Sequence, residues 1–468
     1  MTADNTLDAA TIDRIDSFLR ERLREDELPG LSLAVTDGDE LLYAQGYGSR
    51  DLTANDPATA DTVYGIGSVS KSVAALAIAQ LVDVGELEYD DAVTDYLDID
   101  VPDDVTLHHL LSHTSGYPSL AASEALIARQ MEVGESNVPL GSMDDVYAHI
   151  EGARDEVAGE PGEHWQYCNS GYTLAGEVVE AVSGESFTNY VEGKILDPLR
   201  MDRSTYDEET FTSFDDRMTP YFPGSDDEDG TGSADLEPAA LPIREQSAAA
   251  GGLLAPVTDL ASYLRLHLNG GVTDMGECLV GEDALSQCYG AYAATPSGPY
   301  GYGWRTREVC GHDLIGHGGS IAVSTAAVGF APEQDLGVAL LANASPGYGL
   351  TELSQAVFAA LVGEEPGEVP FFARRQVLES LAGEYETYRG IKEAEVVVES
   401  GALRLRVGGP IEEGSWMPLV PAELESGEFY VPTMAGTRQP VRFEGEGVGA
   451  ADGGDVSLFI DRWHLHQQ

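Results

Sequence analysis

The order of apolar and polar positions predicts a chain that begins with a surface helix and continues into strands. Apolar residues recur at helical spacing from Leu7 to about Arg24, which predicts an amphipathic helix. Two short apolar runs, Leu31–Thr36 and Leu41–Tyr47, are joined by the turn sequence Asp37-Gly38-Asp39 and predict two strands. The next run, from Ser68 to about Val84, is apolar almost all round, and such a helix belongs inside a core.

The middle of the chain is predicted to be mainly helical, and the part after it mainly strand. Helical patterns cover Leu107–Ser112, Tyr172–Val182, Phe187–Ile195, Thr258–Leu268 and Glu352–Val362. Strand patterns between Tyr300 and Ala344 are YGYGWRT, AVSTAAVGF and DLGVALLANAS, and the acidic run SDDEDGTGSAD from Ser225 is typical of a solvated loop. Strands at both ends with helices between them predict an α+β fold, with one antiparallel sheet flanked by helices.

The segment Gly363–Pro370 is short and acidic and contains proline and glycine, so it has the composition of an interdomain linker. From Leu381 onward the chain consists of short alternating runs separated by glycine-rich turns. The clearest runs are LRLRV, EFYV, PVRFE and VSLFI. Their spacing predicts a small all-β barrel or sandwich of about a hundred residues. The predicted domains are residues 1–363 and 371–468.

Composition indicates an ordinary core under a strongly acidic surface. Of the 468 residues, 43% are hydrophobic, enough for one large or two medium domains. The chain has 81 Asp and Glu against 25 Lys and Arg, a formal net charge of −56, which excludes nucleic acid and anionic membranes as partners. Because the Debye length shrinks to about 3 Å at 1 M salt, such self-repulsion is best tolerated in concentrated salt. We therefore expect a salt-adapted protein.

The cysteines and the start of the chain bear on location. The four cysteines are Cys168, Cys278, Cys288 and Cys310. No two have CxxC spacing, which favours a reduced compartment. The first residues lack the basic and apolar regions of a secretory signal, and no stretch approaches 18 uninterrupted apolar residues. These features predict a soluble, cytoplasmic protein.

The first candidate for chemistry is Ser68-Val69-Ser70-Lys71, at the start of the buried helix. Residues i and i+3 of a helix share one face, so the Lys71 ammonium can reach the Ser68 hydroxyl. A lysine in an apolar site loses its charge readily and can act as general base toward a serine nucleophile. Lysine is rare here, with three against 22 arginines, and a buried charge is costly unless it is paired or functional.

Two weaker motifs accompany this one. Tyr167-Cys168-Asn169 lies at a predicted loop-to-helix junction, where Asn169 or Ser170 would make a good N-cap. His317-Gly318-Gly319 lies on or entering an edge strand, and its glycines permit close approach of a ligand or another backbone. Each of these two motifs alone is short enough to arise by chance, and capping is the ordinary explanation for Asn169.

In this order the three motifs resemble those of the serine β-lactamase and penicillin-recognising family, most closely its class C-like branch of esterases, D-aminopeptidases and CubicO-type hydrolases. Three further stretches strengthen the resemblance: LHHLLSHTSG ending at Gly116, ILDPLRMDRSTY ending at Tyr206, and AAAGGLLAPVTDLASYLRLHLNGG ending at Gly271. The resemblance covers about residues 8–362. It implies an all-helical subdomain beside the sheet and, because members of the D-aminopeptidase and CubicO subgroup carry C-terminal barrels, a lipocalin-like barrel at 371–468.

The resemblance also implies the catalytic roles. Ser68 would be acylated, and Lys71 together with Tyr167 would move its proton. The backbone N–H groups of Ser68 and Ser320 would form the oxyanion hole. Asn169 would orient the substrate amide.

The substrate-binding residues implied by the resemblance are Asn169, His317, Gly318, Gly319 and Ser320. His317 departs from the family pattern, which usually has a lysine at this place. A lysine would be a permanent cation for a β-lactam or peptide carboxylate, whereas histidine is largely neutral near pH 7. The histidine lowers the expectation of efficient β-lactamase activity. The sequence His317-Gly318-Gly319 instead resembles that of the D-aminopeptidase and archaeal CubicO subgroup.

We expect a serine hydrolase that forms an acyl-enzyme with a small ester, amide or short peptide, without a cofactor. The alternatives are a β-lactamase, or a penicillin-binding sensor with little turnover. A zinc site at His109 and His113 is disfavoured, because the pair lacks the Glu of H-E-x-x-H and an obvious third ligand. An α/β-hydrolase is disfavoured because the chain has no G-x-S-x-G. The sequence makes no prediction of oligomeric state.

Overall fold

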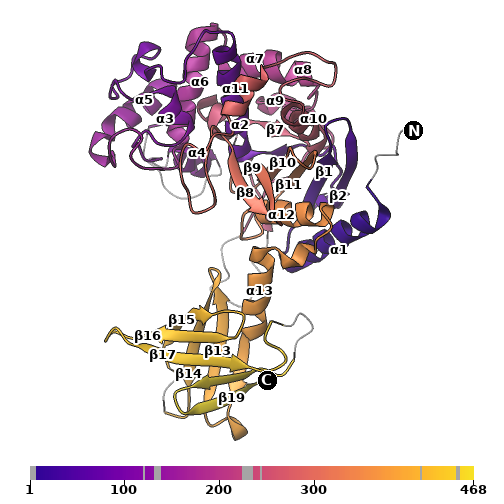
Figure 1. The fold of residues 1–468 in the computed structure, drawn as a ribbon, viewed down its shortest axis with the longest axis vertical. Coiled ribbons are helices and arrows are strands. Elements are labelled where there is room, and N and C mark those ends of the chain that lie inside the picture. Colours follow the sequence, from indigo (N-terminus) through magenta and orange to yellow (C-terminus); the bar gives the residue numbers. More distant parts are fainter. Residues whose placement is uncertain are drawn as a thin grey trace. The chain divides into compact units, whose positions relative to one another are not determined.

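The chain forms two compact units, Met1–Glu364 and Glu365–Gln468. The computed structural model describes residues 7–119, 122–130, 139–223, 236–242, 245–411, 414–449 and 454–468. The acidic run predicted as a solvated loop from Ser225 lies outside the described residues. In Figure 1 the chain can be followed by colour from indigo in the first unit to yellow in the second.

The first unit is built on a seven-stranded antiparallel sheet, which confirms the predicted α+β fold. The strand order is β3-β2-β1-β11-β10-β9-β8, so the N-terminal hairpin lies beside strands from the end of the unit. The strands are β1 (Gly30–Thr36), β2 (Leu41–Asp51), β3 (Asp56–Pro57), β8 (Arg305–Val309), β9 (His312–Ser320), β10 (Thr325–Ala331) and β11 (Leu336–Ala342). β1 and β10 are buried along their whole length, because helices cover both faces of the sheet.

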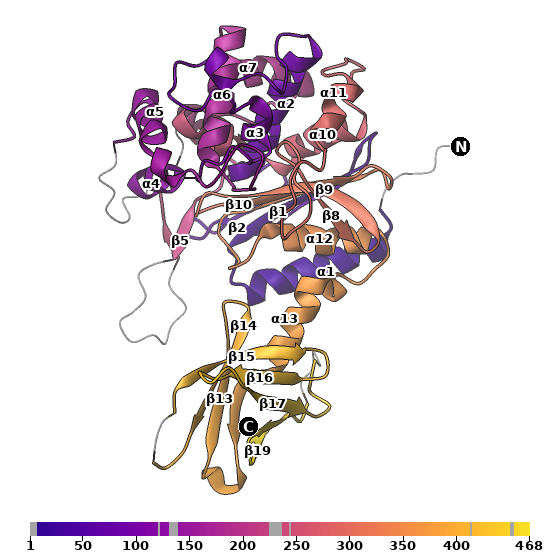
Figure 2. The same ribbon diagram turned by 60° about the vertical axis from the view of Figure 1, so that its left-hand side comes forward.

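Figure 2 shows how the helices cover the sheet. α1 (Ala9–Glu25) and α12 (Leu350–Leu361) lie against each other on one face, and α10 (Val257–Leu268) lies on the other. α1 follows the predicted amphipathic pattern and buries Ile15 and Leu19. These helices bury the central strands β1, β10 and β11.

The all-helical subdomain implied by the resemblance is present beside this sheet. Its helices are α3 (Leu107–Leu111), α4 (Ala122–Gln130), α5 (Met143–Gly152), α6 (Asn169–Ser183), α7 (Phe187–Val191) with the π-helical turn Glu192–Leu196, α8 (Asp197–Leu199), α9 (Glu208–Ser213) and α11 (Glu282–Gln287). The predicted N-caps of α6, Asn169 or Ser170, are wrong: the cap is Cys168, whose sulfur accepts a hydrogen bond from the N–H of Gly171 at 3.3 Å. The Asn169 side chain is instead engaged by Lys71.

The apolar run after Ser68 forms the buried helix α2 (Ser70–Asp83), preceded by the 3₁₀ turn Gly67–Val69. Nearly all residues of α2 are buried, as the all-round apolar pattern predicts. Ser68 therefore lies in the 3₁₀ turn and not, as predicted, at the opening of the α-helix. Gly67 has a φ of +52°, and a Cβ atom there would lie 2.6 Å from the backbone nitrogen of Ser320, so the turn approaches β9 only because this residue is glycine.

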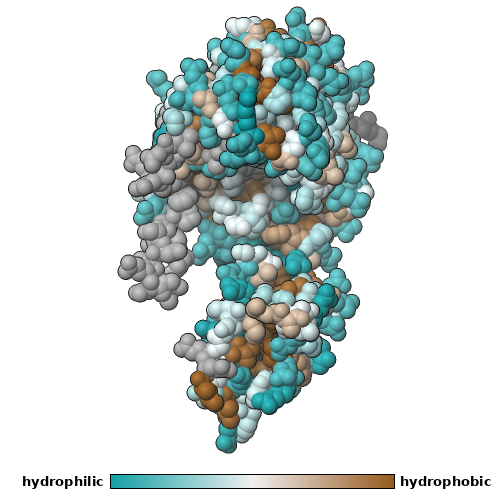
Figure 3. Space-filling model, turned by 90° about the vertical axis from the view of Figure 1, so that its left-hand side faces the viewer, coloured by the Kyte–Doolittle hydropathy of each residue, from teal (hydrophilic) through white to brown (hydrophobic). Residues whose placement is uncertain are grey.

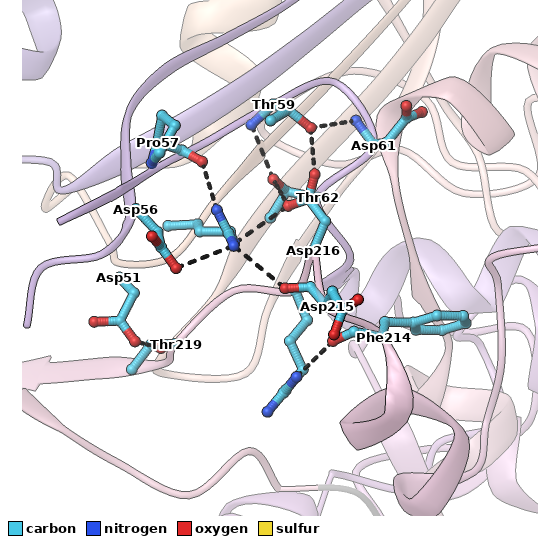
Figure 4. A network of polar contacts seen from close by, with 12 residues as sticks. Asp51, Asp56, Pro57, Thr59, Asp61, Thr62, Phe214, Asp215, Asp216 and Thr219 are labelled. Atoms are coloured by element: carbon cyan, nitrogen blue, oxygen red, sulfur yellow. Dashed lines mark hydrogen bonds and ion pairs between the residues drawn. The ribbon is translucent and has the colours of Figure 1, made fainter. Parts of the chain in front are cut away.

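A polar network anchors the chain just before this turn (Figure 4). The Asp216 carboxylate accepts hydrogen bonds from the hydroxyls of Thr59 and Thr62, both at 2.6 Å. Arg50 on β2 adds an ion pair to the same carboxylate at 3.4 Å. Because charge-assisted bonds of this kind are short and directional, the network fixes the path of the chain toward the 3₁₀ turn.

The second unit is a closed eight-stranded antiparallel barrel, which confirms the predicted C-terminal barrel. Its strands are β12 (Gly383–Glu386), β13 (Glu393–Glu399), β14 (Ala402–Gly408), β15 (Trp416–Glu423), β16 (Glu428–Pro432), β17 (Arg438–Glu444), β18 (Ser457–Ile460) and β19 (Trp463–Gln467). Alternating residues such as Leu403 and Leu405 fill the barrel core. The alternation does not predict α13 (Pro370–Leu381), which precedes the barrel, or the 3₁₀ turn Pro366–Glu368 in the expected linker.

Hydrophilic side chains cover most of the face drawn in Figure 3, and the hydrophobic residues on it form separate patches. This surface agrees with the acidic composition. In the parts of the chain that the structure describes, no helix combines the length and the apolar character needed to cross a membrane.

Candidate active site

Ser68 and Lys71 are in direct contact. Lys71 Nζ donates a hydrogen bond to Ser68 Oγ at 3.0 Å. The same amine donates to Asn169 Oδ1 at 2.7 Å and to the carbonyl of Ala250 at 2.6 Å. Ser68 is partly exposed, whereas Lys71 is completely buried. Three separate parts of the chain therefore converge on one buried amine.

Burial changes the chemistry of this amine. Its three hydrogen-bond acceptors, Ser68, Asn169 and Ala250, are all neutral. Because burial penalises the ammonium form, the pKa of Lys71 is lowered from 10.5 to about 7. Near neutral pH a large fraction of Lys71 is thus an uncharged amine. Its two N–H bonds can serve Asn169 and Ala250, and its lone pair can then accept the proton of Ser68.

Tyr167 lies beside the same amine, with Lys71 Nζ 4.9 Å from the centroid of its ring. The rings of His113 and Trp165 pack against it, at centroid distances of 4.3 and 6.4 Å. Burial raises the pKa of the Tyr167 hydroxyl, and a hydrogen bond with Ser68 partly offsets the rise. Tyr167 is therefore a neutral phenol at physiological pH and can donate a proton.

Residues 317–320 form the last part of β9, opposite the Ser68 turn. The predicted edge position is wrong for β9 as a whole, because β8 lies outside it. The pairing of β8 with β9 ends at Gly316, however, while β10 pairs with β9 to its end. A Cβ atom on Gly319 would lie 1.9 Å from the carbonyl oxygen of Ile66 and 3.0 Å from the backbone nitrogen of Ser68. The strand end is therefore held tightly against the turn that carries Ser68.

The two backbone N–H groups expected to bind an oxyanion lie on these facing segments. Gly67 lies against the nitrogen of Ser320, and Gly319 lies against the nitrogen of Ser68. Both serines border the same hollows. Fixed N–H donors of this kind can stabilise charge that develops on a carbonyl oxygen.

We expect Gly319→Ala to lower kcat/KM for an ester by about 10²–10³-fold, the usual effect of losing one oxyanion donor. The added methyl group overlaps the Ile66 carbonyl and forces β9 away from the Ser68 turn. Gly193→Ala is the matched control, because a Cβ atom there meets nothing within 4 Å. Steady-state kinetics and melting temperature are measured on both variants. A folded Gly319→Ala enzyme with full activity would contradict this placement of the oxyanion donors.

A chain of hydrogen bonds connects His113 to His317 through Tyr300. The N–H of Cys168 donates to His113 Nδ1 at 3.1 Å, and His113 Nε2 lies 3.2 Å from Tyr300 Oη. Tyr300 Oη lies 3.0 Å from His317 Nε2, and His317 Nδ1 lies 2.6 Å from the carbonyl oxygen of Gly318.

Burial determines which group donates in each of these hydrogen bonds. It lowers the pKa of His113 well below its usual value and that of His317 to about 3, so both imidazoles are neutral. A neutral His113 that accepts at Nδ1 carries its proton on Nε2 and donates to Tyr300. Tyr300 then donates to His317 Nε2, and His317 Nδ1–H donates to Gly318. His317 is thereby held in one neutral tautomer and supplies no cation to the site.

Sequence reasoning did not identify His113 or Tyr300 as parts of the site. His113 lies in the stretch LHHLLSHTSG, which is part of the family resemblance and could have indicated a role in the site. Tyr300 was predicted to lie in a strand, but β8 begins only at Arg305, and Gly303 turns the chain with a φ of +71°. The loop that results carries Tyr300 into the site.

The two histidines of the possible metal pair have separate partners. His109 Nδ1 accepts a hydrogen bond from the N–H of Thr106 at 3.1 Å, and His113 is bonded to Cys168 and Tyr300. Within the described ranges there is no group of three or more His, Cys, Asp or Glu side chains that could hold a metal ion.

Two hollows meet at Ser68 and Ser320. The first, of about 500 Å³, is called here the arginine hollow and is lined by Tyr167, Arg305, Arg307, Gly316, His317, Gly318, Gly319 and residues 347–351. The second, of about 440 Å³, is called the apolar hollow and is lined by Asn169, Leu126, Ile127, Ala128, Pro242, Ala250 and Ile321. Tyr167 and Asn169 thus border different hollows on either side of Ser68.

Comparison with known families gives two matches along the chain. The family model described as Beta-lactamase matches residues 15–360. The one described as Pab87 octamerisation domain matches residues 366–466. The two matched regions fall in the two compact units of the structure.

Three relatives illustrate the similarity. Protein flp of Staphylococcus aureus (strain MW2) is 27% identical over 349 residues, 72% of this chain and 64% of that protein, so the chain spans less than two thirds of its length. Penicillin-binding protein 4 of Amycolatopsis lactamdurans is 28% identical over 388 residues, 78% of this chain and 95% of that protein. The solved structure of the octameric penicillin-binding protein homologue from Pyrococcus abyssi is 32% identical, with a TM-score of 0.88 over 97% of this chain and 100% of that chain.

Proposed function

This chain belongs to the Beta-lactamase family of serine hydrolases, and from that premise we propose that it hydrolyses an ester or amide bond through an acyl-enzyme on Ser68. The observation that carries the proposal is the hydrogen bond from the buried amine of Lys71 to Ser68 Oγ. Hollows of about 500 and 440 Å³ on the two sides of Ser68 suit a small ester, amide or short peptide.

In the proposed acylation step, the neutral amine of Lys71 takes the proton of the Ser68 hydroxyl while Oγ bonds to the substrate carbonyl carbon. The carbonyl oxygen becomes an oxyanion between the N–H groups of Ser68 and Ser320. Asn169, whose Oδ1 is held by Lys71, presents the rest of its amide to the acyl side of the substrate.

In the proposed departure of the leaving group, the Tyr167 hydroxyl donates its proton to the leaving oxygen or nitrogen as the bond to the acyl carbon breaks. Tyr167 then regains a proton from the Lys71 ammonium, which restores both groups. Water next adds to the acyl carbon, gives up a proton through the same groups, and releases Ser68 and the free acid. The raised pKa of Tyr167 and the lowered pKa of Lys71 suit these roles.

Steady-state release of p-nitrophenol from a p-nitrophenyl ester tests this function. We expect continuous turnover well beyond one equivalent per active site. A burst of one equivalent of p-nitrophenol with no further release would instead indicate an acylated sensor. Absence of any acylation would refute the proposal.

A β-lactamase or penicillin-binding sensor is the second candidate, supported by the 28% identity to penicillin-binding protein 4. The neutral His317 weighs against it, because this residue supplies no cation for a β-lactam carboxylate. Purified protein assayed with a chromogenic cephalosporin, esters and D-aminoacyl amides in high salt separates the candidates.

We also propose that the protein is adapted to a salt-rich cytoplasm. The net charge of −56 and the free cysteines among the described residues, of which Cys168 and Cys288 are buried, support this. Salt screens repulsion among the surface carboxylates.

The salt proposal makes a direct prediction. We expect the circular dichroism spectrum to show a folded protein in molar salt and a cooperative loss of structure as salt is removed, because carboxylate repulsion then grows. A spectrum and a melting temperature that do not change with salt would contradict the proposal.

For the two regions we propose a catalytic domain at 1–363 and a lipocalin-like assembly domain at 371–468. Support for assembly comes from the octamerisation domain match and from the octameric homologue. Exposed apolar side chains on the barrel unit, among them Tyr388, Ile391 and Met434, are the kind of surface that a subunit contact buries.

We expect light scattering in molar salt to give the full-length protein a mass about eight times the 49.8 kDa of one chain. The exposed apolar residues of the barrel would be buried in that assembly, and concentrated salt strengthens apolar association. A mass of one chain at every concentration tested would contradict the proposed assembly.

A further inference from the structure

We propose that His464 and His466 on the second unit bind one divalent ion of the Zn²⁺, Ni²⁺ and Cu²⁺ class, with water in the remaining coordination positions. Both histidines lie on β19, a strand of the barrel (Figure 1). They take no part in the chemistry proposed at Ser68, so the inference goes beyond the proposed function.

The two histidines project from the same outer face of the barrel. They stand two residues apart on β19, and side chains at such positions leave a strand on the same side. Leu465 between them is completely buried in the barrel core, whereas both histidines are exposed to solvent. An ion in solution can therefore reach both imidazole rings.

The two imidazole rings are close enough to share one ion. Their centroids lie 4.4 Å apart, with an angle of 51° between the ring planes. Imidazole nitrogens bind zinc at about 2.0–2.1 Å, so two nitrogens on one ion lie about 3–4 Å apart. The spacing of the rings is compatible with that separation of the nitrogens.

Strand β18 holds both rings in place. The His464 ring stacks on Phe459, with centroids 4.2 Å apart and ring planes at 16°. His466 Nδ1 lies 3.2 Å from Ser457 Oγ. Histidines that bind metals commonly donate their other ring N–H to an oxygen atom, which orients the ring. The contact of His466 Nδ1 with Ser457 does the same and leaves Nε2 for the ion.

The imidazole nitrogens of the pair are otherwise uncommitted. Among the residues that the structure describes, His464 makes no hydrogen bond through its ring, and His466 makes only the one with Ser457. Other histidines use a ring nitrogen to hydrogen-bond a group of the first unit, namely His108, His109, His113, His267, His312 and His317. The pair on β19 differs from these in offering nitrogen atoms to solvent.

The charges around the pair favour a cation. Glu386 on β12 is the cross-strand partner of His466, so its side chain leaves the barrel on the same face. Arg442, the cross-strand partner of Phe459, is matched by the Glu444 carboxylate at 2.7 Å. Positive charge beside the pair is thus neutralised, while the Glu386 carboxylate and the net charge of −56 attract an ion.

The donor atoms determine which ions the site takes. Imidazole nitrogen suits Zn²⁺, Ni²⁺ and Cu²⁺, whereas carboxylate oxygen suits Mg²⁺ and Ca²⁺. In the described part of the chain no third His, Cys, Asp or Glu completes the site. Two protein ligands and several waters therefore make an exchangeable site, which holds Cu²⁺ tightest of the three ions.

Copper(II) tests the site, because its electron paramagnetic resonance spectrum distinguishes nitrogen from oxygen ligands. Full-length protein in molar salt receives less than one equivalent of Cu²⁺, and a large excess of Mg²⁺ keeps surface carboxylates from competing. The exposed thiols of Cys278 and Cys310 are alkylated first, because thiolates also bind such ions. We expect splitting from two imidazole nitrogens in the wild-type spectrum, and one Ni²⁺ bound per chain by calorimetry.

Variants assign the ion to the two histidines. We expect His464→Gln/His466→Gln to lose the nitrogen splitting and to bind Ni²⁺ at least about 10-fold more weakly, since losing even an indirect contact to a metal ligand costs this much. Each single variant should bind more weakly than the wild type. His164→Gln, which removes an exposed histidine of the first unit, is the matched control. Circular dichroism in molar salt checks that each variant is folded.

A wild-type spectrum without nitrogen splitting would overturn the site. A folded double glutamine variant that keeps the splitting and the wild-type affinity for Ni²⁺ would also overturn it. If the double variant fails to fold, the two single variants decide, and wild-type affinity in both would count against the site. Binding is measured without any substrate, so the result does not depend on whether the protein hydrolyses esters.

Discussion

Ser68→Ala is expected to abolish turnover, with kcat lowered about 10⁴–10⁶-fold, and to abolish covalent labelling by a fluorophosphonate probe. No other hydroxyl is bonded to the Lys71 amine in the described part of the chain, so no neighbour can take over the nucleophilic role. The fold should survive, because Ser68 is partly exposed and its side chain fills little volume.

The matched control for this variant is Ser286→Ala, which removes an exposed serine hydroxyl on α11. It should label and turn over like the wild type. Labelling is followed by gel fluorescence and turnover with a p-nitrophenyl ester. Undiminished labelling of a folded Ser68→Ala protein would refute Ser68 as the nucleophile.

Lys71→Met is expected to lower kcat/KM about 10²–10⁴-fold, the usual contribution of a general base. Methionine keeps most of the apolar volume of the side chain and removes only the amine, so the buried helix should still pack. Lys194→Met, at an exposed position, is the matched control. A Lys71→Met enzyme with wild-type kcat/KM would exclude Lys71 as the base.

The pH profile of the wild type gives a second readout of Lys71. The amine acts as base only when it is uncharged, and its pKa is lowered to about 7. Activity should therefore rise with pH through about 7 and level off above it. Lys71→Met should lose this limb of the profile. A wild-type profile that is flat from pH 5 to 9 would contradict the assignment.

Much of the fold follows from local pattern. The all-round apolar run after Ser68 predicted a fully buried helix, and α2 is that helix. The alternation in LRLRV and VSLFI predicted barrel strands, now β14 and β18. Both predictions succeed because burial on one face, or on all faces, sets the spacing of apolar residues along the sequence.

Contacts between segments that are distant in sequence produce no such spacing, so they were not predicted. The Asn169 side chain caps no helix, because Lys71 engages it across 98 residues of sequence separation. Cys168, one residue earlier, is the cap instead. Local propensity describes which contacts a residue can make within its own segment. The Lys71 amine comes from a distant segment, so propensity could not predict that it would bind the Asn169 side chain.

Arg305 and Arg307, which line the hollow beside Ser68, were not predicted as site residues for a related reason. Charged residues at alternate strand positions normally mark a solvated face, and nothing local distinguishes these two from that case. Only the three-dimensional arrangement shows that their shared face opens into the hollow beside Ser68. The same holds for Tyr300, whose role depends on His113 and His317, each in a different segment.

Ser68 is expected to carry the acyl group during turnover. The most direct measurement is mass spectrometry of peptides from enzyme quenched during turnover of an ester. We expect one added acyl group per chain, on the peptide that contains Ser68 and on its side-chain oxygen, and we expect it to disappear as the ester is exhausted. Acylation at another residue, or turnover without any acylated peptide, would contradict it.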